Sequence, residues 1–217
     1  MQVYQIIMLS GYAVCVCAMV VMKFLNVDNR RRGVVKCISS ALFLSMAVVG
    51  FVRDGGEFSV VALLGVIFAA AGDVFLVFMD KRCCFLCGVF SFALASLCLS
   101  TYCTLVFDWQ WWFSIVFVVL LVALVIGQVT KVIDFGSCMV SLNIYTIFVA
   151  LCGSLGLTLF VQGTGNYKAF LFGLGCFMYL VSDICLGLYL YKFRNRYIDS
   201  ANTLLYFPGL MLIALAL

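Results

Sequence analysis

Long apolar runs separated by short polar breaks are the dominant pattern of this sequence. The runs lie at about 4–25, 34–52, 58–79, 83–107, 111–130, 137–161, 168–191 and 201–217. A helix needs about 20 apolar residues to cross the hydrocarbon core of a membrane. Continuous runs are typical of spanning helices, because spanning strands would show short alternating segments instead. The pattern therefore predicts an all-α polytopic membrane protein, a bundle of eight transmembrane helices.

The composition agrees with this pattern and narrows the class of protein. Hydrophobic residues make up 66% of the chain and charged residues 10%, against about 45–50% and about 25% in ordinary soluble domains. These values exclude a soluble globular protein, and eight spans leave too little chain for a second folded unit. We therefore expect residues 1–217 to form a single integral-membrane helical domain. The 12 cysteines lie mostly inside apolar runs and are interpreted as reduced, buried side chains.

The basic residues indicate how the spans are oriented. Eleven of the 13 lie at every other break, and Arg53 and Lys168 lie at the remaining breaks. The eleven are Lys23, Arg30, Arg31, Arg32, Lys36, Lys81, Arg82, Lys131, Lys192, Arg194 and Arg196. Cytoplasmic loops are enriched in Lys and Arg, so we expect the loops after spans one, three, five and seven to be cytoplasmic and both termini to lie outside. Because these residues serve topology, the net charge of +4 does not indicate a nucleic-acid partner.

Two acidic residues do not fit the pattern of charges at breaks. Seven of the nine carboxylates fall at breaks, whereas Asp73 lies within LLGVIFAAAGDVFLVF and Asp183 within GLGCFMYLVSDICLGLYLY. A charged group in the middle of a spanning helix costs about 2.5–3.5 kcal/mol even on the insertion scale. Such residues normally face the bundle interior and take part in function. The structural alternative is that each Asp caps a broken helix or hydrogen-bonds a neighbouring helix.

The two aspartates occupy similar positions in their spans. At 1.5 Å per residue, Asp73 lies ~10 Å and Asp183 ~13 Å from the cytoplasmic end of its span. The spans run in the same direction, so we expect both carboxyls to face one shared cavity. The segments 72–76 (GDVFL) and 182–186 (SDICL) both contain a small residue, an Asp, two apolar residues and a Leu, 110 residues apart. This similarity indicates a possible 4+4 parallel internal repeat, as in some transporters.

Two buried carboxyls in one cavity suit two kinds of function. Burial and mutual repulsion allow one carboxyl to stay protonated while the other ionises, which supplies an acid and a base. Such a pair suits hydrolysis through an oxocarbenium-like state, as in glycoside hydrolases. It suits a proton-coupled transporter equally well, because intramembrane carboxyls carry coupling protons. The residues alone leave both functions open.

Three motifs resemble the YhhN-type lysoplasmalogenase family. They are AGDVFL at 71–76, GVFSF at 88–92 and FMYLVSDICL at 177–186, on an eight-span chain of about this length. Weaker matches are Lys36 at the start of span two, Tyr145 in span six and the run 205–207. The resemblance covers essentially the whole chain. It implies a membrane enzyme that hydrolyses the vinyl ether bond of a lysoplasmalogen to a fatty aldehyde and glycerophospho-ethanolamine or -choline.

The resemblance also implies roles for charged residues. We expect Asp73 and Asp183 to act as catalytic acid and base, with the assignment of the two roles open. The single alkyl chain of the substrate would enter laterally among the apolar spans. Lys36 and Arg82 would meet its phosphate near headgroup level. Their ordinary role in setting topology explains both residues as well.

Three polar residues within the spans complete the candidate substrate-binding set. Tyr145 is one of the weaker family matches. Tyr179 lies one turn before Asp183 on the same helix face, and it either orients that carboxyl or packs in the core. Asn143 either lines the cavity or forms a hydrogen bond between helices.

The chain departs from the family pattern in span four. The family usually carries a His there, whereas this sequence has no His and reads ALASL at 93–97. If the family His is catalytic, the activity or the substrate differs in this protein. No metal-binding spacing or Gly-rich phosphate loop is evident, so we expect no cofactor and no metal. The expected partners are a lysophospholipid substrate and membrane lipids, with no obligate protein partner evident.

Two functions compete with the hydrolase. A small proton-coupled transporter or a lipid-binding membrane protein would use the same aspartate pair. Transporters commonly have matching pairs of helices broken by Gly or Pro. Pro208 is the only proline of the sequence, which favours the enzyme over the transporter.

Overall fold

The computed structural model describes residues 3–108, 110–131 and 135–217, and every regular element in these ranges is helical. Two short 3₁₀ turns, Gly136–Cys138 and Gly163–Gly165, precede α6 and α7. The eight α-helices are α1 (Val3–Phe24), α2 (Asn29–Asp54), α3 (Ser59–Val77), α4 (Arg82–Val106), α5 (Phe113–Val129), α6 (Met139–Gln162), α7 (Tyr167–Tyr191) and α8 (Arg196–Ala216). The predicted all-α fold is confirmed.

The helix lengths match a multi-pass membrane protein. Seven of the helices in the described ranges are long and apolar enough to span a bilayer. The exception is α5, whose 17 residues extend about 26 Å at 1.5 Å per residue, slightly less than a hydrocarbon core of about 30 Å. The apolar pattern located the helices but not all of their ends, because helical hydrogen bonding continues into polar flanks. The helix α2, for example, begins at Asn29, although its predicted apolar run starts at 34.

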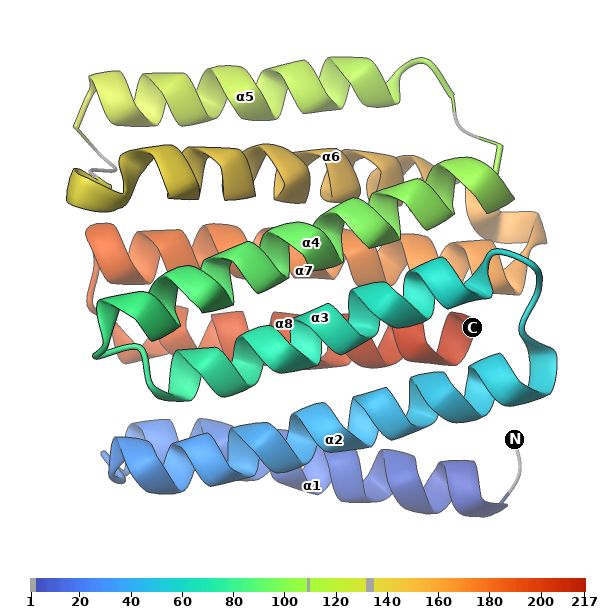
Figure 1. The fold of residues 1–217 in the computed structure, drawn as a ribbon, viewed down its shortest axis with the longest axis horizontal. Coiled ribbons are helices and arrows are strands. Elements are labelled where there is room, and N and C mark those ends of the chain that lie inside the picture. Colours follow the sequence, from blue (N-terminus) through green and yellow to red (C-terminus); the bar gives the residue numbers. More distant parts are fainter. Residues whose placement is uncertain (1–2, 109, 132–134) are drawn as a thin grey trace.

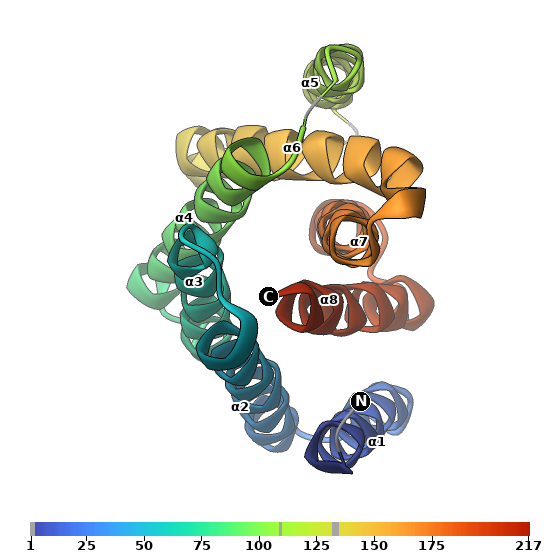
Figure 2. The same ribbon diagram turned by 90° about the vertical axis from the view of Figure 1, so that its right-hand side faces the viewer.

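The helices lie side by side along the long axis of the molecule (Figure 1), and both chain termini lie at the same end. Viewed along the helices (Figure 2), α1, α2, α3, α4 and α6 form an arc that surrounds α7 and α8. The helix α5 stands outside this arc and packs against α6. Its side chains are not buried, which agrees with its peripheral place.

The contacts between helices agree with the possible 4+4 repeat. In each half, consecutive helices pack together: α1 with α2, α2 with α3 and α3 with α4, and likewise α5 with α6, α6 with α7 and α7 with α8. Between the halves, α2 packs against α8 as α6 packs against α4. The halves differ at their first helix, because α1 also packs against α8.

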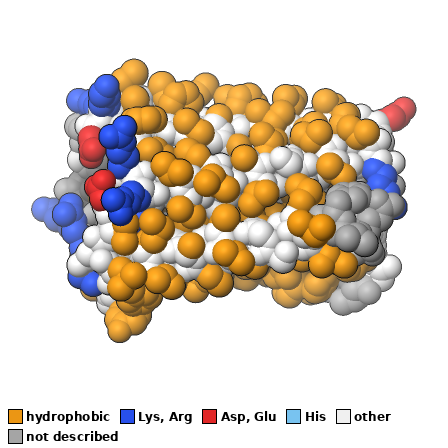
Figure 3. Space-filling view, turned by 90° about the horizontal axis from the view of Figure 1, so that it is seen from below, with side chains coloured by type: hydrophobic (Ala, Val, Ile, Leu, Met, Phe, Trp, Pro, Cys, Tyr) orange, Lys and Arg blue, Asp and Glu red, His pale blue; other side chains and the backbone are white. Residues whose placement is uncertain are grey.

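Lys and Arg side chains gather at one end of the molecule (Figure 3), opposite the chain termini. The connections after α1, α3, α5 and α7 lie at this end, which we call the basic end. The basic residues that the sequence places at every other break therefore gather at one end of the bundle.

Small residues allow close packing between α7 and α8. A Cβ atom on Gly175 of α7 would lie 2.6 Å from the carbonyl oxygen of Gly209 on α8, closer than packed atoms approach. In contrast, a Cβ atom on Gly187 would meet nothing within 4 Å. Gly175 serves packing, and Gly187 borders open space.

Candidate active site

Asp73 is fully buried on α3 and is held by two side chains of α2. Its Oδ1 atom lies 2.9 Å from the Nζ atom of Lys36, and the hydroxyl of Ser40 donates to its Oδ2 atom at 2.6 Å. Lys36 and Ser40 are four residues apart, so they lie on one face of α2 and reach the same carboxylate. A buried charge is tolerated when it is paired and hydrogen-bonded. Asp73 has both a cationic partner, Lys36, and a hydroxyl donor, Ser40.

Asp183 on α7 is held from a different side. The hydroxyl of Tyr145 on α6 donates to its Oδ2 atom at 2.6 Å. The Asp183 side chain is half-buried and faces the cavity described below. Among the described residues, no Lys or Arg forms an ion pair with Asp183. The two carboxyls interact electrostatically with each other. Of the two, only Asp73 has a cationic partner among the described residues.

Buried tyrosines surround the two carboxyls. The hydroxyl of Tyr179 receives a hydrogen bond from Ser96 of α4 at 3.4 Å and lies beside the Tyr145 hydroxyl. A helical side chain points back toward the helix N-terminus, so the Tyr179 ring leads away from Asp183, and Tyr145 makes the direct contact. Tyr206 on α8 packs against the Tyr179 ring, with ring centroids 5.9 Å apart.

One cavity of about 680 Å³ joins these groups and is lined by residues of all eight helices. Its volume lies within the range of roughly 300–1,000 Å³ typical of small-molecule sites. Apart from the aspartate pair, its charged lining residues are Lys23, Arg32, Lys36, Asp80 and Asp199. The helices α5 and α6 contribute no charged residue, and line it mainly with Leu, Ala and Val side chains.

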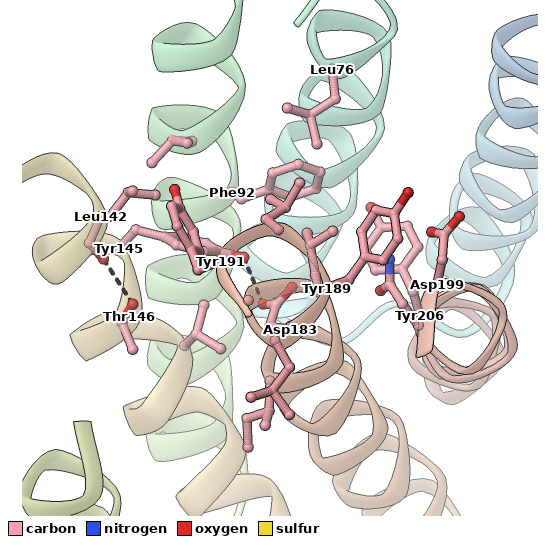
Figure 4. A pocket seen from close by; sticks show the side chains of 18 of the residues that line it. Leu76, Phe92, Leu142, Tyr145, Thr146, Asp183, Tyr189, Tyr191, Asp199 and Tyr206 are labelled. Atoms are coloured by element: carbon pink, nitrogen blue, oxygen red, sulfur yellow. Dashed lines mark hydrogen bonds between the residues drawn. The ribbon is translucent and has the colours of Figure 1, made fainter. Parts of the chain in front are cut away.

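The cavity therefore has a polar part and an apolar part, with the carboxyls between them. Asp73 is bound by α2, on the side of the charged lining residues, and Asp183 is bound by α6, on the apolar side. In Figure 4, Asp183 lies between Tyr145 of α6 and the α8 residues Tyr206 and Asp199. Both aspartates face one cavity, as the sequence predicted. Both also link neighbouring helices, as the structural alternative expected.

Three of the sequence-predicted site residues do not line this cavity: Arg82, Asn143 and Tyr179, which contacts Ser96. Arg82 is exposed at the start of α4 and does not line the cavity. Asn143 accepts a hydrogen bond from the side-chain amide of Gln128, which joins α6 to α5. That contact is the helix-to-helix bond that was the alternative interpretation of Asn143.

Some residues at the cavity were not among the candidates from the sequence. Ser40 donates a hydrogen bond directly to Asp73. A serine costs little free energy in an apolar helix, so its presence there did not mark it as a site residue. From the sequence, Lys23 was assigned only a role in setting the topology. In the structure its ammonium contacts the Asp199 carboxylate, the Asp199 carbonyl and the Thr203 hydroxyl. These contacts connect α1 to α8 and occupy the donors of Lys23.

The site offers carboxyl and hydroxyl chemistry. In the described residues, no group of three His, Cys, Asp or Glu side chains is placed to hold a metal ion. At the start of α4, Cys83 and Cys87 are exposed, Cys84 is partly exposed, and none of the three forms a disulfide. The groups available to react at the cavity are therefore the aspartate pair, Lys36 and the tyrosine hydroxyls.

The fold and the site define a class of protein: a multi-pass helical membrane protein with two carboxyls in a cavity among its helices. The model of the YhhN family matches residues 31–217. The chain belongs to the YhhN family. Neither a comparison with curated proteins nor a comparison with solved structures gives a match.

Proposed function

We propose that this protein is a membrane hydrolase that cleaves the vinyl ether bond of a lysoplasmalogen, as its family membership suggests. The observation that carries the proposal is the position of two carboxyls between a charged part and an apolar part of one cavity. In a vinyl ether lysophospholipid, the bond to be cleaved lies where the polar headgroup meets the alkyl tail. A substrate whose tail lies along α5 and α6 would place that bond at the carboxyls.

The first step is protonation of the alkenyl carbon that is farther from the ether oxygen. We propose Asp183 as the acid, because it lies on the apolar side of the pair and has no ion-pair partner among the described residues. Its Oδ2 atom receives the Tyr145 hydrogen bond, which leaves Oδ1 to carry the proton. Proton transfer to carbon produces an oxocarbenium ion, whose positive charge the resulting Asp183 carboxylate stabilises.

The second step is addition of water to the carbon next to the ether oxygen. We propose Asp73 as the base, because it forms an ion pair with Lys36 and lies on the charged side of the cavity. Water forms a bond to this carbon and gives one proton to Asp73. The hemiacetal then collapses: its hydroxyl proton passes to the Asp183 carboxylate, the bond to the glycerol oxygen breaks, and that oxygen takes the proton held by Asp73. An aldehyde and a glycerophospho alcohol leave, and both aspartates return to their starting forms. Acid and base chemistry suffices for every step.

The charged part of the cavity suits the phosphate of the substrate. Arg32 lines the cavity near Lys36, and a guanidinium matches phosphate geometry well. We propose Arg32 as the phosphate contact, in place of the exposed Arg82. Because the donors of Lys23 are occupied by Asp199 and Thr203, Lys23 is a structural residue in this account.

We also propose an orientation in the membrane, with the basic end cytoplasmic and both termini outside. The asymmetry of Lys and Arg supports it. The test uses a variant of the protein without its native cysteines. A single cysteine is added either in the loop after α3 or at the C-terminus, and intact cells are treated with an impermeant maleimide. Labelling of the loop but not of the terminus would contradict the orientation.

Release of fatty aldehyde from lysoplasmenylethanolamine by purified protein tests the function. We expect aldehyde from the unmodified protein and a loss of about 10²-fold or more in Asp73→Asn and Asp183→Asn. Asp80→Asn is the matched control, because Asp80 is an exposed carboxylate that lines the same cavity. No aldehyde from the unmodified protein would contradict the hydrolase. Proton-coupled uptake into vesicles, lost in the same two variants, would support a transporter instead.

A further inference from the structure

The hydroxyl of Tyr206 is a buried polar group that the proposed mechanism has not yet used. Tyr206 is 7% exposed, lines the cavity, and has no hydrogen-bond partner for its hydroxyl. The rings of Phe92, Tyr179 and Phe207 pack around it, with centroids 6.0, 5.9 and 4.9 Å from its own. This packing fixes the ring, and with it the position of the hydroxyl.

Other buried tyrosines of the bundle differ in this respect. The hydroxyl of Tyr12 donates to the carbonyl of Phe207, Tyr145 donates to Asp183, and Tyr179 is bound by Ser96. Buried polar groups are nearly always hydrogen-bonded, and an exception points to a ligand or a water molecule. Tyr206 is a cavity-lining residue, so the cavity is the route by which a small partner reaches its hydroxyl.

Tyr206 shares its surroundings with Asp73. The Tyr206 hydroxyl lies within reach of the Asp73 carboxyl. The Oδ1 atom of Asp73 forms the ion pair with Lys36 but, like the Tyr206 hydroxyl, takes part in no hydrogen bond with the described residues. Two neighbouring buried oxygen atoms, on two residues that line one cavity, therefore both lack a well-formed hydrogen bond.

We infer that Tyr206 is a third catalytic residue, which together with Asp73 holds the attacking water. This inference rests on the proposed function. The water donates one hydrogen to Asp73 and the other to the Tyr206 oxygen, and its lone pair then faces the oxocarbenium carbon. As the new carbon–oxygen bond forms, the first hydrogen moves to Asp73 as a proton, and Tyr206 keeps its own proton. A phenol is both donor and acceptor and suits this position.

The test compares Tyr206→Phe with Tyr12→Phe in purified protein acting on lysoplasmenylethanolamine. Each variant removes one buried tyrosine hydroxyl. Tyr12 is on α1, its hydroxyl donates to a backbone carbonyl of α8, and it does not line the cavity. We expect kcat to fall about 10²-fold in Tyr206→Phe with little change in KM, because misplacement of a reacting group by about 1 Å costs that much. Tyr12→Phe lowers the melting temperature and leaves kcat unchanged.

A second readout separates the held water from a general loss of structure. Methanol added to the reaction competes with water for the oxocarbenium carbon: its oxygen bonds to that carbon, its proton goes to Asp73, and a mixed acetal forms. Without Tyr206 to hold water, the ratio of acetal to aldehyde rises several-fold in Tyr206→Phe and stays constant in Tyr12→Phe.

Each outcome of this experiment has a defined meaning. Unchanged kcat in Tyr206→Phe, equal losses in the two variants, or an unchanged acetal ratio overturns the role of Tyr206 while the hydrolase stands. If the unmodified protein releases no aldehyde, the hydrolase and this inference are both overturned.

Discussion

Two glycines of α7 allow a direct test of whether the cavity holds the substrate. Gly187 lies one turn after Asp183, lines the cavity, and has open space where a Cβ atom would be. A helical side chain points toward the helix N-terminus, so the side chain of Gly187→Leu would extend toward Asp183. The substitution therefore fills the space next to the proposed acid without displacing a packed neighbour.

The structure also sets the size of the expected effects on stability. Replacing a glycine inside a helix stabilises by roughly 0.5–1 kcal/mol when no contact is disturbed, so Gly187→Leu keeps or raises the melting temperature. Gly175→Ala places its Cβ 2.6 Å from the Gly209 oxygen and 2.7 Å from a side-chain carbon of Ile213. Such overpacking costs about 1–3 kcal/mol, which exceeds the helix gain, so this variant melts at a lower temperature.

Thermal unfolding in detergent and aldehyde release on the same samples provide the assay. We expect Gly187→Leu to be stable and nearly inactive, and Gly175→Ala to be less stable but active below its melting temperature. Full activity in Gly187→Leu would refute the placement of the substrate in this cavity. An unchanged melting temperature in Gly175→Ala would refute the close contact between α7 and α8.

Three further substitutions separate reaction from structure. Tyr145→Phe removes the hydrogen bond that holds Asp183 as it gives up its proton and becomes a carboxylate; since bonds to charged groups are worth about 1.5–3 kcal/mol, kcat should fall about 10-fold or more, and an unchanged kcat would exclude this role of Tyr145. Lys23→Met leaves Asp199 without its ion-pair partner and should destabilise by about 3 kcal/mol in a thermal melt, with kcat preserved in the folded protein; an unaltered melt would show that the pair is not structural. Arg82→Gln should leave KM unchanged, because Arg82 lies outside the cavity, and a raised KM would restore it as a phosphate contact.

The sequence was sufficient to predict the helical bundle and the aspartate pair. Both follow from the high cost of polar groups in a bilayer: long apolar runs must be helices, and Asp73 and Asp183 stand out because a charge is expensive there. Tyr145 came from the family resemblance rather than from physical reasoning. It then proved to be the hydrogen-bond partner of Asp183.

Other features of the site depend on packing between distant segments, which the pattern of one chain does not contain. Serine and tyrosine are common in apolar helices, so no large free-energy cost distinguishes Ser40 or Tyr206 in the sequence. Tyr179 shares a helix face with Asp183, but the direction of its side chain leads it to Ser96. The peripheral place of α5 was equally invisible, because its apolar run resembles those of the other spans.

The order of bond formation is the central claim, and isotopic labelling during hydrolysis tests it most directly. The reaction is run in deuterated water and, separately, in ¹⁸O-labelled water, with the aldehyde trapped as it forms. The account predicts one deuterium on the carbon next to the aldehyde group and no ¹⁸O in the glycerol hydroxyl of the released glycerophosphoethanolamine. An aldehyde without carbon-bound deuterium, or ¹⁸O in that hydroxyl, would contradict protonation of the alkene followed by addition of water.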